Sequence, residues 1–219
     1  MKFSKFVPAF LSIGLLASTA ASAAIVVHTS AFITPGNVTN FNGFESIPND
    51  GTFFTGGSGP YTEQGISVEQ VNPSSPIWVT YGLSGWGEGN FSWYPNGGDQ
   101  GATKITKFDG SQFTDIQFIY GSGFGVATST SYQLLLANVV VASGSVAGGT
   151  GSTPSFLGFS GGGFDEIVMN DHSGSGPANA FAIDSIALGV GTNNVPEPGT
   201  LALLCAALLG FSALRRRRE

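Results

Sequence analysis

The sequence predicts an all-β protein, an antiparallel β-sandwich of jelly-roll type. Short runs rich in Val, Ile, Phe and Thr alternate with turn-forming clusters of Gly, Pro, Asn and Asp. These runs follow one another at a spacing of about ten residues, which is typical of sandwiches and barrels. The sequence shows neither a long apolar period of 3.6 residues nor a βαβ alternation, and both absences argue against helical layers.

The candidate strands lie between the turn clusters. We expect them near residues 25–33, 38–44, 65–71, 77–81, 90–94, 102–107, 112–120, 131–142, 155–160, 164–169 and 179–189. Residues 143–151 are rich in Gly and Ser, and we expect them to form a loop.

Two of these runs predict which side chains are buried. Ile116, Phe118 and Tyr120 alternate with Asp115 and Gln117, so one face of this strand should be apolar and the other polar. The run 180–188 is apolar on both faces, as expected for a central strand.

The N-terminal residues have the pattern of a secretory signal peptide. Lys2 and Lys5 precede an apolar run, and small residues ending in Ala21-Ser22-Ala23 follow it. A basic region, an apolar region and an A-x-A cleavage site predict a Sec-type signal peptide over 1–23; the alternative is an uncleaved anchor. The β-sandwich domain is then expected over 24–194, long enough for one domain with its own core.

The C-terminal residues, VPEPGTLALLCAALLGFSALRRRRE, contain a short apolar segment followed by a basic cluster. Residues 201–214 are uncharged and rich in Leu and Ala, which favour a helix. Such a helix rises about 21 Å, less than the hydrocarbon core of about 30 Å. Arg215, Arg216, Arg217 and Arg218 should remain on the cytoplasmic side of the inner membrane. By composition alone, this segment is a weak single-pass membrane anchor.

The order of these features resembles the PEP-CTERM sorting signal of Gram-negative bacteria. The triplet is Pro196, Glu197 and Pro198, followed by the apolar helix and the arginine cluster, and the resemblance covers residues 195–219. It implies recognition by an exosortase, a transpeptidase-like membrane enzyme, with cleavage near the triplet. It also implies transient anchoring in the inner membrane, delivery to the cell surface or extracellular matrix, and an association with exopolysaccharide and biofilm.

The charge of the domain restricts its partners. Between Ala24 and Leu214 the only bases are Lys104 and Lys107, against thirteen acidic residues, a balance of −11. A surface this acidic argues against nucleic acid and anionic membranes as partners, and it is compatible with neutral glycans or divalent cations. The single cysteine, Cys205, lies in the tail, so the domain has no disulfide.

Two acidic residues are candidates for a structural metal site. Asp184 lies inside an otherwise apolar run, where a carboxylate is costly unless it is paired or bound to a cation, and Glu45 follows an early aromatic run. The combination of an early glutamate and a late aspartate resembles the pattern of jelly-roll domains of the galactose-binding and MAM-like kinds. This resemblance implies that the two carboxylates ligate a structural Ca²⁺. Calcium takes six to eight oxygen ligands, more than two acids supply. The alternative is that Asp184 only hydrogen-bonds to the backbone.

The aromatic residues gather between Trp78 and Tyr94, where all three tryptophans lie. Exposed aromatic rings stack on sugar rings, and neighbouring polar side chains bind the hydroxyls. The candidate glycan-binding residues are Trp86, Trp93, Tyr94 and Asp99. Trp78 and Trp93 lie in predicted strands, so burial in the core is the favoured interpretation for them. For Trp86, in a Gly-rich stretch, both interpretations remain open.

No catalytic group stands out. Asp171, His172 and Ser173 are contiguous, whereas a working triad is assembled from separated residues. We therefore expect a non-enzymatic protein that binds glycan or serves a structural role in an exopolysaccharide matrix. The alternative is a secreted glycan-active hydrolase that uses a carboxylate pair.

Overall fold

The computed structural model describes residues 24–46, 52–54, 60–71, 77–81, 87, 89, 91–95, 102–122, 129–149, 153–172 and 181–190. Within these ranges, the side chains of 52–54, 77–81, 94–95, 122, 171–172 and 181 are not described. The predicted signal peptide, with Ala21 and Ala23, lies outside the described residues. The same holds for the sorting signal, with its triplet and arginine cluster.

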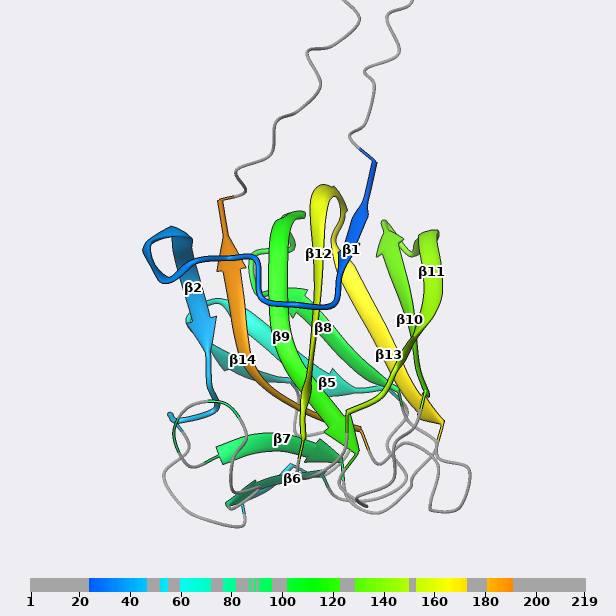
Figure 1. Cartoon of the computed structure of the whole chain (residues 1–219). Helices are drawn as coiled ribbons and strands as arrows, with labels where there is room; N and C mark the ends of the chain where they lie inside the picture. The colour runs from blue at the N-terminus through cyan, green and yellow to red at the C-terminus, as the bar shows by residue number, and fades with distance from the viewer. Residues whose placement is uncertain are drawn as a thin grey trace, which may run out of the picture. The chain divides into compact units, whose positions relative to one another are not determined.

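The described residues form two antiparallel sheets that pack face to face, which confirms the predicted all-β sandwich (Figure 1). The larger sheet contains β1 (Val26–His28), β12 (Ser155–Phe164), β9 (Phe113–Ser122), β14 (Phe181–Gly189), β2 (Val38–Asn42), β7 (Phe91–Pro95), β6 (Ile77–Tyr81) and β3 (Thr52–Phe54). The smaller sheet contains β11 (Val139–Ala147), β10 (Ser129–Leu136), β13 (Glu166–His172), β8 (Thr103–Lys107), β5 (Ile66–Gln70) and β4 (Tyr61–Glu63). A short 3-10 turn, η1 (Pro35–Asn37), precedes β2.

The strand order is that of a jelly roll. In the larger sheet the order is β2, β14, β9, β12, and in the smaller sheet it is β8, β13, β10, β11. The chain passes between the sheets repeatedly, so that strands far apart in sequence lie side by side. β14 occupies the centre, because β9 pairs along one side of it while β7 and then β2 pair along the other.

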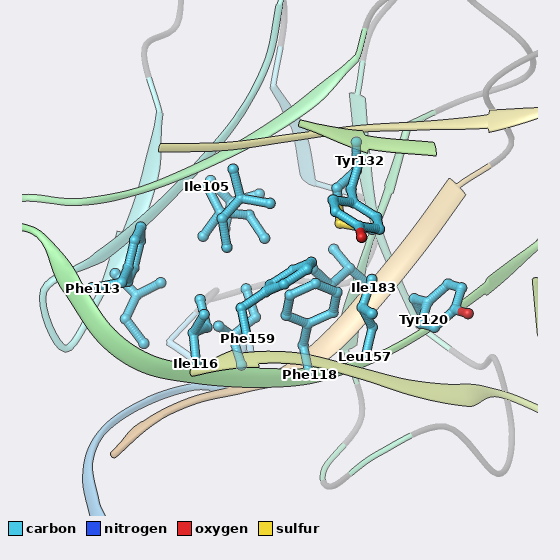
Figure 2. Close-up of a cluster of buried hydrophobic side chains, with 14 of the residues drawn as sticks. Ile105, Phe113, Ile116, Phe118, Tyr120, Tyr132, Leu157, Phe159 and Ile183 are labelled. Carbon is cyan, nitrogen blue, oxygen red and sulfur yellow. The ribbon is translucent and has the colours of Figure 1, made fainter. Parts of the chain in front are cut away.

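The core lies between the sheets. Figure 2 shows Ile105 and Tyr132 facing Ile116, Phe118 and Phe159, which approach from the opposite side. Ile116, Phe118 and Tyr120 of β9 all belong to the core cluster, as predicted from the sequence, because the pleat directs alternate residues to one face. The opposite face is not simply polar and exposed, since Asp115 and Ile119 are buried as well. The predicted central strand is also confirmed, since the described side chains of β14 are almost all buried.

The region after residue 130 differs from the sequence prediction. The single strand expected at 131–142 is a hairpin, because Ala137 and Asn138 adopt φ angles of 49° and 65° and turn the chain between β10 and β11. Residues 143–147 continue β11, so the prediction of a loop at 143–151 is wrong for these residues. They pair with β10, and Val146 packs against the core, while Gly144 leaves space for the Tyr132 ring.

Two short strands were not expected from the sequence. These are β3 and β4, of three residues each. β4 forms a hairpin with β5 through Gln64 and Gly65, which have φ angles of 44° and 79°. A run of three residues is too short to show a period of two, so the sequence pattern does not reveal such strands.

Candidate functional site

The segment between β1 and β2 crosses the outer face of the larger sheet, and we call residues 29–37 the strap (Figure 1). Gln117, on the outer face of β9, binds it. The side-chain Oε1 of Gln117 accepts the backbone N–H groups of Phe32 and Ile33, each at 2.8 Å. Its Nε2 donates to the carbonyl oxygen of Ile33 at 3.3 Å. One side chain therefore satisfies three backbone groups that no strand pairs with.

Two glycines of the sheet leave room for the strap. A Cβ on Gly158 would lie 2.5 Å from the ring of Phe32, and a Cβ on Gly189 would lie 2.8 Å from Ile33. Any larger residue at either position would push the strap away from the sheet. The His28 ring stacks on Phe32, with a centroid distance of 3.9 Å and an interplanar angle of 13°.

The strap forms one wall of a pocket of about 610 Å³ on this outer face. Such a volume lies within the range of small-ligand sites, about 300–1,000 Å³. All the described residues that line it are uncharged: Ile33, Pro35, Val38, Phe41, Gly87, Gln117, Ile119, Pro154, Phe156, Ser185 and Ala187. The ring of Phe156 is 40% exposed, whereas Ile119 and Ala187 are buried in the floor. The pocket is therefore mostly apolar, with Gln117 and Ser185 as its polar side chains.

The hydrogen bonds of Gln117 limit what it can offer in this pocket. An amide carries two acceptor positions and two donors. The strap occupies both acceptor positions and one donor, so one N–H is left for a ligand. The strand pattern predicts that Gln117 lies opposite the core. It does not predict the pocket, because the strap, β12 and β14 come together only in the folded chain.

Glu45 and Asp184, the predicted metal pair, lie beside two closely spaced glycines. A Cβ on Gly87 would overlap the Asp184 carboxylate, and a Cβ on Gly89 would overlap that of Glu45. Both glycines also adopt positive φ angles, of 53° and 76°, which other residues rarely adopt. β2 pairs with β14, so the early and late segments that carry these two residues are neighbours in the sheet.

Both carboxylates bind backbone N–H groups. Oε1 of Glu45 accepts the N–H of Phe91 at 2.8 Å, and Oδ1 of Asp184 accepts the N–H of Ser185 at 2.6 Å. Ser185 has a φ angle of 52° at a register shift in β14, just where the pairing changes from β7 to β2. These contacts agree with the alternative interpretation, in which Asp184 stabilises local backbone.

The described acidic side chains do not gather into a metal-binding cluster around Glu45 and Asp184. Calcium takes six to eight oxygen ligands. Among the residues that the structure describes, no three or more His, Cys, Asp or Glu side chains gather in a way that could hold a metal ion. Glu45 and Asp184 therefore fit only part of such a site, and calcium binding stays a prediction.

The predicted glycan-binding aromatics are only partly described. Trp93 is completely buried, and its ring stacks with Phe44 at a centroid distance of 6.1 Å. It is therefore a core residue, and its candidate role as a sugar platform is wrong. Trp86 and Asp99 lie outside the described residues, and the side chain of Tyr94 is not described.

Other acidic side chains stabilise the fold. Glu63 accepts hydrogen bonds from the hydroxyls of Tyr61, at 2.7 Å, and Ser46, at 3.1 Å. Burial of the Tyr61 phenol, together with this bond, raises its pKa. Glu69 forms an ion pair with Lys104 of the neighbouring strand. None of these acids lines the pocket on the larger sheet.

The geometry thus defines a β-sandwich with an uncharged pocket on one outer face. Residues 194–218 match the family model of the PEP-CTERM protein-sorting motif. This match confirms the motif predicted from the triplet, the apolar segment and the arginine cluster. A search of the curated proteins finds no match to this chain.

The motif implies that the protein is exported, passes through a membrane-anchored stage and is processed by an exosortase, a membrane enzyme. In the part of the chain that the structure describes, no helix has the length and apolar character needed to span a membrane. The predicted apolar helix of the tail lies outside that part.

Proposed function

We propose that this protein is released to the cell surface or extracellular matrix, where it binds neutral exopolysaccharide without catalysing a reaction. The sorting motif supports delivery to that location. The observation that carries the binding proposal is the pocket on the larger sheet, with its exposed Phe156 ring and its uncharged described lining. Phe41, partly buried, lines the same pocket.

The chemistry of this lining suits a sugar in two ways. The C–H faces of a pyranose stack on aromatic rings, and Phe41 and Phe156 offer such rings. Gln117, with its remaining N–H, and Ser185 add polar side chains to this lining, and groups of this kind bind sugar hydroxyls. The balance of −11 between Ala24 and Leu214 favours a neutral polysaccharide over an anionic one, because like charges repel.

The hydrolase alternative gains no support from the described residues. A glycosidase needs two carboxyl groups on either side of the scissile bond, about 5–10 Å apart. The described lining of the pocket contains no carboxyl group. We therefore keep binding, and not hydrolysis, as the proposed role of this pocket.

A substitution of the exposed aromatic ring tests the proposal. Phe156→Ala should weaken retention on the polysaccharide of the producing bacterium by about tenfold, the equivalent of one lost stacking contact. Phe108→Ala is the matched control, because Phe108 is 76% exposed in the turn after β8 and does not line the pocket. Affinity electrophoresis in gels containing the polysaccharide measures both variants. Equal retention of the two variants, or no retention of the wild type, would contradict the proposal.

A further inference from the structure

β11 lies at the edge of the smaller sheet and pairs only with β10 among the described strands (Figure 1). In an antiparallel sheet, alternate residues of an edge strand direct their N–H and C=O groups away from the neighbouring strand. β11 therefore presents a row of backbone donors and acceptors along nine residues. The other described edge strands are shorter: β1, β3 and β4 have three residues each, and β2, which pairs only with β14, has five.

Among the described residues, this edge carries little of the usual protection against pairing with another strand. Proteins protect edges with charged residues, prolines, bulges or covering segments, and β11 contains neither charge nor proline and only one bulge. Val139, Val140 and Val141 are instead 65%, 47% and 44% exposed. The strand has one bulge, at Val141, and its pairing with β10 is regular from Ala142 to Ala147.

The distribution of charge indicates which partner fits. From Ile116 to Phe164, 49 consecutive residues include no Asp, Glu, Lys, Arg or His. Two copies of a strongly acidic domain repel each other over most of their surfaces. This repulsion is weakest along β11, since the strand itself carries no carboxylate and the nearest one that a hydrogen bond locates, Asp165, binds the N–H of Ala137 in the turn before the strand. A charged partner finds no complementary group along the same strand, so a second copy of this chain is the partner that the edge favours.

We propose that two copies of this protein pair antiparallel through β11 and join their smaller sheets into one continuous sheet. Antiparallel pairing about a twofold axis is self-complementary, because each residue meets the same partner on both copies. Full overlap of the nine residues places Ser143 opposite Ser143 of the partner subunit. It also places Val140 opposite Val146 of the partner subunit. The pocket on the larger sheet takes no part in this contact.

Disulfide cross-linking tests the register. Directly opposed residues in an antiparallel pair have Cα atoms about 4.5–5.5 Å apart, within the range that a disulfide spans. In a Cys205→Ser background, Ser143→Cys should give a disulfide-linked dimer under mild oxidation. Ser145→Cys is the matched control, because Ser145 is also exposed but lies opposite Val141 of the partner subunit, too far from its own copy.

Sedimentation velocity of the exported protein tests the association itself. Val140→Lys should raise the dissociation constant of the dimer about tenfold. The substitution is present on both copies, so it alters two cross-strand contacts of the dimer. Val190→Lys, at a 62% exposed position after β14, adds the same charge away from the edge and should leave the dimer unchanged. A wild-type protein that stays monomeric at every concentration, equal effects of the two lysines, or equal cross-linking of the two cysteines would overturn the proposal.

Discussion

Removal of the Gln117 amide should detach the strap from the larger sheet. Gln117→Leu keeps most of the side-chain volume but loses the three hydrogen bonds to Phe32 and Ile33. A typical protein hydrogen bond contributes about 0.5–1.5 kcal/mol net, which gives an upper limit of about 4.5 kcal/mol for the three bonds. These bonds are only partly buried, so water can replace some of them. We therefore expect a loss of about 2 kcal/mol.

Urea denaturation measures the change in the free energy of unfolding, and hydrogen exchange at the Phe32 and Ile33 amides reports on the strap directly. Gln133→Leu is the matched control, since Gln133 is exposed on β10; its effect should stay within about 0.5 kcal/mol. Unchanged exchange at both strap amides in the Gln117 variant would refute the reasoning that this side chain holds the strap.

Three further perturbations test other parts of the molecule. Gly158→Ala should destabilise the fold by about 1–3 kcal/mol, because its Cβ meets Phe32 and the Ile116 carbonyl; Gly36→Ala, with nothing within 4 Å of its Cβ, should change the melting temperature little. If Glu45 and Asp184 hold calcium, chelator should lower the melting temperature and Asp184→Ala should abolish that sensitivity, whereas an unchanged melting curve would exclude the site. Replacement of residues 196–198 by alanines should leave the protein in the membrane fraction, and normal release would refute exosortase processing.

The predictions that the structure confirms depend on local patterns. The alternation of apolar and polar residues in 113–120 predicts that Ile116, Phe118 and Tyr120 lie in the core. The apolar residues on both faces of the last strand predict its position at the centre of the sheet. Such patterns repeat the period of the pleated strand, so neighbouring residues carry the information. The sequence does not reveal the β10–β11 hairpin, because its turn contains Ala137 and no Gly, and alanine rarely adopts a positive φ angle.

The candidate site was less accessible to sequence reasoning. Trp93 and Trp86 belong to the same aromatic-rich stretch, and only packing against Phe44 showed that Trp93 lies in the core. The pocket combines residues from the strap, β2, β9, β12 and β14. Each of these residues is unremarkable in its own segment, so no motif marks the site.

The sequence alone was enough to recognise the sorting motif and the fold class. A sorting enzyme recognises a contiguous stretch of chain, and the period of a strand also depends on neighbouring residues. Both features can therefore be recognised from the local sequence. The tertiary structure alone decided which polar side chains hold the strap, where the pocket lies and which strand forms an open edge. Those features depend on register and on contacts between residues such as Gln117 and Ile33, which lie 84 positions apart in the chain.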